Sequence, residues 1–285
     1  MKFRQKATML VSLLCLIVLL STIGGIYCAK RQCTLPVLMY HHFAETSTEY
    51  TVVSVERFRE QMITLKNAGY QTVTIEQILN YVDKGISLPF KPILVTMDDG
   101  YTSNISEVAP ILEELEMCAT VFVIGINEGE RLYVHSGQPL FPPRFSYEEA
   151  AEWVDKGIID LQCHTFDMHQ LASYGYSGRD GMLQLESENK SSWHRAVCED
   201  LRLFRQRREG RVSTALTALA YPFGYYSQEL DDLLLTEGIR VTFTIEEQNN
   251  CLRIGNPDCL RLLGRFNVVE DYSGEAIVQL LEYSS

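Results

Sequence analysis

The sequence predicts an α/β fold in which parallel strands form a barrel or an open sheet. Short apolar runs alternate with longer amphipathic segments along residues 36–269, a pattern typical of parallel strands joined by crossover helices. Acidic or histidine side chains follow several of these runs, where the functional groups of such folds lie. Neither an internal repeat nor a low-complexity linker interrupts the pattern, so we expect one folded domain.

The expected strands are short apolar runs bounded by glycine, proline or polar residues. They comprise residues 36–40, 71–73, 92–97, 119–124, 158–163, 218–221, 240–244 and a last strand within 260–269. The expected helices are the amphipathic segments between them. They comprise residues 54–68, 74–84, 103–116, 146–156, 192–208 and 227–236, followed by a short helix at the end of the chain.

Capping residues mark where several of these helices begin. Ser54 precedes the first amphipathic segment, and Thr74 and Ser146 are each followed three positions later by Gln or Glu, the spacing of a capping box. Residues 192–208 are dense in both charges, which is typical of a solvent-exposed face. We therefore expect no functional role for that helix.

Two adjacent carboxylates, Asp98 and Asp99, follow the apolar run at residues 92–97. Their burial is costly because each loses hydration and each disfavours ionisation of the other. A bound cation would offset the cost by taking one carboxylate as a ligand and leaving the other free as a base. Taken alone, Asp-Asp-Gly is more typical of a turn.

Two histidines, His164 and His169, follow the apolar run at residues 158–163. One Asp and two His are the usual ligands of a catalytic zinc or similar ion with open coordination positions. Together the two motifs favour a metal site over a turn. Cys163 stands beside His164, but adjacent side chains of a strand point to opposite faces, so we expect Cys163 in the core.

These residues resemble the motifs of the polysaccharide deacetylase family, also known as the NodB homology domain or carbohydrate esterase family 4. Residues 96–101 are similar to its first motif and residues 164–169 to its histidine motif. Two further stretches, residues 39–42 (Met-Tyr-His-His) and 220–224 (Ala-Tyr-Pro-Phe-Gly), resemble the branch that de-N-acetylates poly-N-acetylglucosamine. The resemblance covers residues 35–268 and implies an irregular (β/α)7 barrel.

The resemblance also implies a role for each residue of these motifs. One divalent ion, most simply Zn2+ with Co2+ or Ni2+ as alternatives, would be bound by Asp99, His164 and His169. Asp98 would act as the general base and His41 as the general acid. The backbone N–H of Phe223 would stabilise the oxyanion, with Tyr221 beside it at the substrate.

The sequence departs from the family pattern in its third motif. Arg-x-Pro-Tyr is usual there, but Ala220 stands at the arginine position and Phe223 at the tyrosine. That arginine orients the catalytic aspartate in the family. We expect Arg261 or Arg265, both on the last strand, to replace it.

The general acid is also placed unusually. Most of the family supplies a histidine from the C-terminal part of the domain, whereas the last histidine of this chain is His194. The poly-N-acetylglucosamine branch supplies it from the first strand, which matches His41, with His42 as the alternative. Asp167 is either a hydrogen-bond partner of the metal ligands or a polar loop residue.

The charge of the chain restricts its partners. The net charge is −12, and three basic residues with no acidic residue precede residue 29, so the remainder carries −15. Nucleic acids are bound by neutralising their phosphates with Lys and Arg, so we expect no nucleic acid partner. A neutral or cationic polymer fits the charge better.

The N-terminus predicts a membrane anchor. Residues 1–6 are basic and would stay in the cytoplasm, residues 7–28 are apolar and long enough to span a bilayer, and residues 29–34 would be a linker to a catalytic domain at 35–285. A cleaved signal peptide is the alternative, although Tyr27-Cys28-Ala29 is a poor cleavage site. Either reading places the domain outside the cytoplasm, as a single-pass membrane protein or a secreted one.

Eight cysteines are scattered without a CxxC pair, which argues against a structural zinc site. Cys251 and Cys259 bracket a short polar loop and could form a disulfide in an oxidising compartment. Two separate free thiols are equally compatible with the sequence.

The leading functional hypothesis is a metal-dependent hydrolase that removes N-acetyl groups from a β-linked N-acetylglucosamine polymer at the cell surface. The alternatives are a peptidoglycan deacetylase, an O-acetyl esterase acting on a glycan such as xylan, and a carbohydrate-binding relative without turnover. A polysaccharide synthase or export machinery in the same membrane is an expected partner by analogy.

Overall fold

The computed structural model describes residues 32–45 and 50–283. Its strands are β1 Gln32–Leu35, β2 Val37–Tyr40, β3 His42–Phe43, β4 Val52–Val53, β5 Gln71–Thr72, β6 Pro92–Asp99, β7 Ala119–Val123, β8 Ile159–Cys163, β9 Ala218–Ala220, β10 Val241–Phe243, β11 Asn250–Arg253 and β12 Phe266–Asn267. Its α-helices are α2 Val55–Asn67, α3 Ile75–Lys84, α4 Ala109–Glu114, α5 Tyr147–Asp155, α6 Lys190–Arg208, α7 Gln228–Thr236 and α8 Gly274–Tyr283. Short helical turns are η1 Asn104–Val108, η2 Gly125–Asn127, η3 Ala172–Tyr174, η4 Pro222–Gly224 and η5 Pro257–Leu260.

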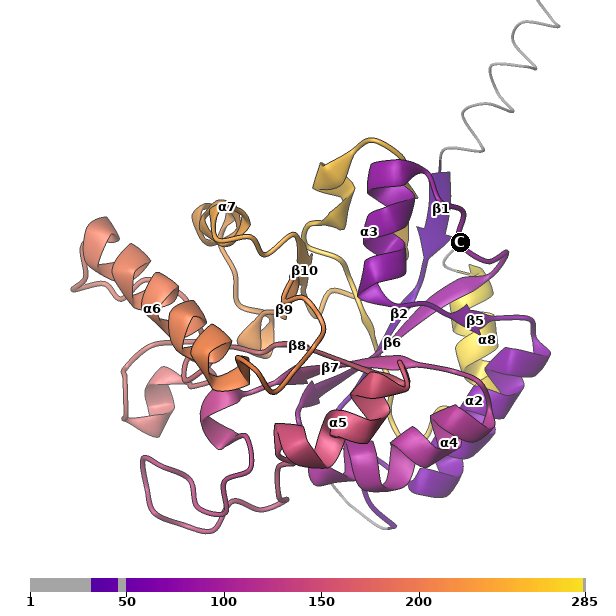
Figure 1. Ribbon diagram of the computed structural model, residues 1–285, viewed down its shortest axis with the longest axis horizontal. Coiled ribbons are helices and arrows are strands. Elements are labelled where there is room, and N and C mark those ends of the chain that lie inside the picture. Colours follow the sequence, from indigo (N-terminus) through magenta and orange to yellow (C-terminus); the bar gives the residue numbers. More distant parts are fainter. Residues whose placement is uncertain (1–31, 46–49, 284–285) are drawn as a thin grey trace, which may run out of the picture.

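A curled sheet of eight parallel strands forms the centre of the molecule (Figure 1). Seven strands follow the order β10-β9-β8-β7-β6-β2-β12, and β5 pairs with β6 off this path. Helices α2, α4, α5 and α8 lie to one side of the sheet in this view, with α6 and α7 beside β8, β9 and β10. The α/β fold predicted from the alternating pattern is therefore confirmed, and the curl agrees with a barrel of the expected kind.

Side chains of the central strands alternate between two cores. Leu94 of β6 packs in one cluster with Phe122 and α3, whereas Val95 and Met97 pack in the cluster under the other helices. Because the side-chain period of a strand is two, Asp98 shares the face of Leu94. The Asp98 carboxylate therefore lies on the face that packs with Phe122 and α3 and away from the cluster of Val95 and Met97.

One segment near the C-terminus contacts both ends of the sheet. Leu263 forms a parallel bridge with Phe243 of β10, and Phe266 of β12 pairs with Leu38 of β2. The last strand predicted within residues 260–269 is thus only the two residues of β12, because η5 and the positive φ of Leu262 (54°) interrupt it. This segment carries Arg265 into the interior, where it is fully buried.

Most predicted helix starts are confirmed. Ser54 caps α2, and Thr74 and Ser146 form complete capping boxes at α3 and α5. The helix expected at 103–116 is confirmed over residues 102–114, where the π-helical residues of η1 run directly into α4. Pro110 comes just after η1, and a π-helical turn beside a proline is a common irregularity within a helix.

Some pairings were not expected from the sequence. β1 pairs antiparallel with β11, so residues 32–34 of the expected linker belong to the folded body.

Cys251 and Cys259 are both free thiols. The predicted anchor at residues 7–28 lies outside the described residues, and within the described ranges no helix is long and apolar enough to cross a bilayer.

Candidate active site

Several predicted site residues meet at the carboxyl ends of β2, β6 and β8, three of four consecutive strands in the sheet. β6 ends in Asp98 and Asp99, β8 is followed directly by His164, and β2 by His41. Because β6 pairs in parallel with both β2 and β7, and β7 with β8, all these ends lie on one edge of the sheet. The prediction that sequence-distant residues converge there is confirmed.

Asp99, His164 and His169 form one compact cluster. Asp99 Oδ1 lies 3.6 Å from His164 Nε2 and 3.4 Å from His169 Nε2. One ligand atom from each of the three residues lies within 4.8 Å of the others, as metal binding requires. Asp99 Oδ1 is buried and has no hydrogen-bond partner among the described residues. Two imidazole nitrogens and a carboxylate oxygen with open positions suit Zn2+, so the donor set fits a catalytic metal.

The orientation of His164 is fixed by the neighbouring strand. Its Nδ1 lies 2.8 Å from the carbonyl oxygen of Ala220, which can only accept a hydrogen bond. His164 therefore carries its proton on Nδ1, and the lone pair of Nε2 faces Asp99. Ala220 stands at the position of the family arginine, and its backbone carbonyl accepts the hydrogen bond that orients His164.

The backbone leaves regular strand geometry where Asp99 must share a site with Asp98. Adjacent strand residues point to opposite faces, but Asp99 has a φ of 73°. Thr165, next to His164, has a φ of 71°, and Phe223 has a φ of 57°. Such left-handed conformations are rare for Thr and Phe, less so for Asp, and cluster at functional sites. At Asp99 the positive φ turns the side chain away from the face that regular strand geometry would give it.

Arg265 holds Asp98 in place. Its Nη1 and Nη2 donate to the two carboxylate oxygens of Asp98 at 2.7 and 2.8 Å, a bidentate pair between buried groups. Burial alone would raise the pKa of Asp98, but the charge of Arg265 and its hydrogen bonds, together with the neighbouring His164, outweigh burial and lower the pKa. Asp98 is therefore ionised and rigidly oriented beside the candidate metal ligands. Of the two arginines expected to replace the family arginine, Arg265 does so.

Arg261 serves a different purpose. Its Nε donates to Asp231 Oδ2 at 2.8 Å, and its Nη2 donates to the backbone carbonyl of Asp231 at 2.6 Å. The expectation that Arg261 could orient the catalytic aspartate is therefore wrong. The two arginines are four residues apart on a segment without regular structure, so no periodicity in the sequence distinguishes them.

The structure separates the two histidines that follow β2. His41 is close enough to Asp98 and Asp99 to lower the pKa of both, and its Nδ1 is buried without a hydrogen-bond partner among the described residues. Asn104 Nδ2 donates to the His41 carbonyl at 2.8 Å. His42 instead places Nδ1 2.9 Å from Ser103 Oγ, at the start of η1. This geometry favours His41 as the acid.

The family model described as polysaccharide deacetylase matches residues 86–242, which is more than half of the chain. The chain belongs to the polysaccharide deacetylase family.

Relatives support the same family over most of the chain. A poly-beta-1,6-N-acetyl-D-glucosamine N-deacetylase of Staphylococcus aureus is 23% identical over 87% of this chain and 88% of that protein. YxkH of Bacillus subtilis, named for the same family, is 25% identical over 70% of this chain but only 60% of its own length. The structure of IcaB from Ammonifex degensii has a TM-score of 0.71 and 26% identity, covering 87% of this chain and 97% of that one.

In the third motif, residues 220–224, Tyr221 does not lie where the sequence predicted. The Tyr221 side chain is fully buried, and its hydroxyl donates to Asp231 Oδ1 at 2.6 Å. Tyr221 is thus a core residue, and the prediction that it contacts substrate is wrong. Phe223 does lie at the site, with its ring centroid 4.5 Å from that of His169.

Asp167 does not bond a metal-ligating histidine. Its Oδ1 lies 2.7 Å from His135 Nε2, and Gln170 Nε2 donates to the same oxygen at 2.9 Å. Of the two alternatives left open for Asp167, the loop residue is correct. It nevertheless connects the deacetylase motif to a second loop that carries His135.

Two residues near the site were missed in the sequence. Asp200 of α6 accepts the backbone N–H groups of Phe166 and Asp167 at 2.7 and 2.8 Å, which fixes the loop between the two metal-ligating histidines. The expectation that α6 has no functional role is therefore wrong. A signal existed, because Asp200 falls on the apolar face of α6 with Val197 and Leu201. Arg144 was also missed.

Arg144 lies against the second oxygen of Asp99. Its Nη2 is 4.0 Å from Asp99 Oδ2, and its guanidinium stacks 3.6 Å above the ring centroid of Tyr101. Burial opposes ionisation of Asp99, but His169, Arg144 and His164 together lower its pKa. Burial lowers the pKa of His169 to about 4 despite the nearby Asp99 charge. Both ligands are thus in the deprotonated form that binds a metal at neutral pH.

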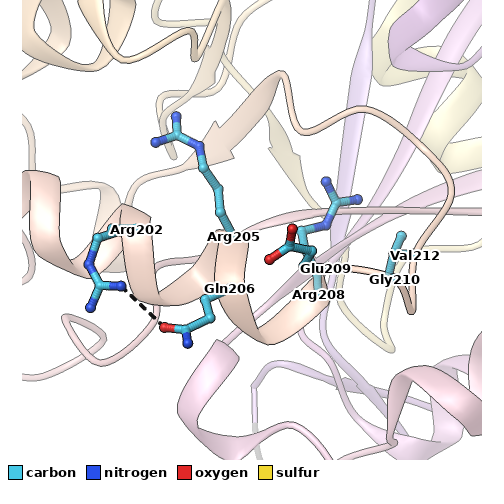
Figure 2. Close-up of a pocket in the computed structure, with 7 residues that line it drawn as sticks. All are labelled: Arg202, Arg205, Gln206, Arg208, Glu209, Gly210 and Val212. Atoms are coloured by element: carbon cyan, nitrogen blue, oxygen red, sulfur yellow. Dashed lines mark hydrogen bonds between the residues drawn. The ribbon is translucent and has the colours of Figure 1, made fainter.

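A cavity of about 640 Å3 lies elsewhere, at the C-terminal end of α6 (Figure 2). Its arginines are engaged: Arg202 pairs with Glu199, Arg205 with Glu237, and Arg208 with backbone carbonyls. It also lacks any of the deacetylase motif residues. The candidate site is therefore the cluster at the sheet edge and not this cavity.

Proposed function

We propose that this chain removes N-acetyl groups from N-acetylglucosamine units of a cell-surface polysaccharide of the poly-N-acetylglucosamine type, using one bound divalent ion, most simply Zn2+. The observation that carries the proposal is the bidentate Arg265–Asp98 pair beside the Asp99, His164 and His169 cluster. A base fixed next to three ligand atoms is the arrangement that hydrolysis of an acyl group requires.

The chain's own residues divide the proton transfers between them. When bound, the metal supplies Lewis-acid chemistry that polarises the acetyl carbonyl and acidifies water. Asp98, ionised and oriented by Arg265, accepts the proton of the attacking water. His41 then donates a proton to the leaving amine, which is too basic to depart unaided. The Phe223 N–H supports the negative charge on the acetyl oxygen.

The choice of substrate rests on the relatives and on the position of the acid. The Staphylococcus aureus relative is named for poly-beta-1,6-N-acetyl-D-glucosamine and aligns along most of both chains. His41 follows the first strand of the barrel, as the resemblance to that branch implies. An acidic body of net charge −15 also suits a polymer that becomes cationic as acetyl groups leave.

We further propose that the enzyme acts outside the cytoplasm as a single-pass membrane protein, alongside a polysaccharide synthase or export machinery. The support is the apolar sequence of residues 7–28 behind three basic residues. Cleavage of this segment would give a secreted enzyme instead.

Acetate release tests the proposed reaction. We expect the full chain with Zn2+ to release acetate from β-1,6-linked N-acetylglucosamine oligomers, and a chelator to abolish the release. Preference for β-1,4-linked oligomers would redirect the assignment to peptidoglycan or chitin, and release from acetylated xylan alone would make the chain an esterase. Metal binding without any release would support a carbohydrate-binding relative.

A further inference from the structure

Two loops outside the barrel meet beside the active site. One joins η2 to α5 and extends away from the sheet (Figure 1), and the other spans residues 171–181. Hydrogen bonds within the first loop define its shape: Tyr133 N donates to Gln138 O at 2.8 Å, and Leu140 N to Arg131 O at 2.9 Å. The loop is therefore a fixed, hairpin-like projection.

Three aromatic side chains of these loops pack on one another. His135 stacks on Tyr176 with ring centroids 5.1 Å apart and planes at 23°. Tyr133 meets both rings edge-on, at 5.4 Å from His135 and 5.7 Å from Tyr176. We call Tyr133, His135 and Tyr176 the ring cluster.

The ring cluster is joined directly to the loop between His164 and His169. His135 Nε2 lies 2.7 Å from Asp167 Oδ1, within hydrogen-bond distance, and Gln170 Nε2 lies 3.2 Å from the same nitrogen. Asp167 is two residues from His169, a span of at most about 7 Å along the chain. The cluster thus begins next to the metal ligands, on the side of His169.

The cluster is open to solvent rather than part of the core. Tyr176 is 45% exposed, and the neighbouring Leu132 and Val134 are 53% and 59% exposed. A cavity of about 380 Å3 lies between this loop and Phe166 of the histidine motif. Aromatic rings that stack on one another while exposed to solvent are typical of a ligand site when a cavity and partly exposed polar groups lie beside them. The polar groups here are Asp167 and His135.

We propose that the ring cluster is a sugar-binding subsite for a unit of the polymer beyond the one that is deacetylated. This inference rests on the proposed function, because a polymer bound at the metal site must continue over the adjoining surface. The apolar C–H face of a pyranose ring would stack on Tyr176 and Tyr133. Asp167 and His135, about one-third and one-quarter exposed, would bond its hydroxyl or acetamido groups.

Binding to oligomers of different length tests the subsite. In the full chain carrying Asp98→Asn, chosen to slow turnover during the titration, we expect β-1,6-linked N-acetylglucosamine hexamer to bind more tightly than the dimer in calorimetric titrations. Tyr176→Ala and Tyr133→Ala should each weaken hexamer binding about 5- to 20-fold, the lower part of the range known for a ring that stacks on a nucleic acid base, and dimer binding less than about 2-fold. Tyr176→Trp should retain hexamer affinity. Phe141→Ala, on the same loop and 87% exposed, is the matched control and should change neither affinity.

The opposing outcomes are distinct. If the tyrosine substitutions weakened dimer and hexamer binding equally, the rings would only position the histidine motif. Unchanged hexamer affinity in both variants, or no hexamer binding by the parent chain, would also overturn the subsite. Tyrosine-dependent binding to phosphatidylglycerol vesicles with unchanged hexamer affinity would assign the cluster to a lipid surface instead. Tyrosine-dependent hexamer binding in a chain whose unsubstituted form releases no acetate would uphold the subsite and reject the proposed function. Melting curves of both tyrosine variants should match the parent, since the rings lie outside the core.

Discussion

Asp98 and Asp99 are neighbours in sequence but have different environments. Asp98 keeps strand geometry and both its oxygens bond Arg265, whereas Asp99 turns through a positive φ and leaves Oδ1 without a hydrogen-bond partner among the described residues. An oxygen without a hydrogen-bond donor is available to a cation. A carboxylate whose two oxygens each accept one hydrogen bond from a guanidinium can still accept a proton, but only on its remaining lone pairs. The two environments therefore support one ligand and one base.

Replacing the base should separate chemistry from metal binding. We predict that Asp98→Asn lowers kcat for acetate release by about 10²–10⁴-fold, the usual contribution of a general base. Because Asp99, His164 and His169 are untouched, the bound metal should remain close to one equivalent by elemental analysis. Full activity would remove Asp98 as the base, and loss of the metal would make it a ligand.

The burial of Arg265 predicts its effect on stability. Arg265→Ala leaves the Asp98 charge buried and unpaired, so we expect a loss of about 3–5 kcal/mol in unfolding free energy. Arg240→Ala is a matched control, because Arg240 also bonds a carboxylate in bidentate fashion, Asp83, at 2.7 and 2.8 Å, but at a half-exposed site. The control should cost about 1 kcal/mol or less. Urea denaturation of both variants measures the difference, and equal losses would contradict the role of burial.

At the residue level, the sequence was informative where a side chain directly follows an apolar strand. Asp98, Asp99, His164 and His41 could be placed at one edge because strand ends must coincide in a parallel sheet. Arg265 could only be narrowed to one of two arginines, since its partner lies 167 positions away and no pattern encodes that contact. Tyr221 was misplaced because a residue after a strand can as easily point into the core.

At the level of elements, α6 shows how a charged helix can serve the site. Its surface is dense in charge, as the sequence predicted, but its apolar face carries Trp193, Val197, Leu201 and Phe204 into the core. Asp200 on that face reaches the histidine motif. Helix packing thus fixes the metal-binding loop, a contact that composition alone cannot reveal because it depends on which face is buried.

The buried carboxylate of Asp200 predicts a pH dependence of stability. Burial raises its pKa to about 6, only partly offset by backbone N–H groups of Asp167 and Phe166, whereas an unfolded Asp titrates near about 4. The folded state therefore binds more protons between these values, and its stability falls as pH rises through this window, by about 3 kcal/mol in total. Asp200→Asn cannot ionise and should lose this fall. The stability of the variant relative to the parent should rise between pH 4 and 7 in urea titrations, and parallel curves would contradict the raised pKa.

At the level of the whole molecule, we propose that the two ends of the barrel have different tasks. The Asp99, His164 and His169 cluster lies at the carboxyl ends of the strands, whereas β1 leads into β2 from the opposite end, where it pairs with β11. Gln32 and His41 are nine residues apart along nearly extended chain, about 30 Å at strand geometry. A segment attached before Gln32 would therefore join the body far from the substrate.

Two truncations test this separation. A chain that begins at Gln32 keeps every described strand, so we expect acetate release from soluble hexamer within about twofold of the full chain. A chain that begins at Val37 lacks β1, and with it the fully buried Leu35 and the pairing partner of β11. Loss of one buried leucine and its contacts should cost about 2–5 kcal/mol, visible as a lower melting temperature. If the chain beginning at Gln32 lost activity while keeping the melting temperature of the full chain, residues 1–31 would contribute to catalysis, and the division of the barrel into an attachment end and a catalytic end would be wrong.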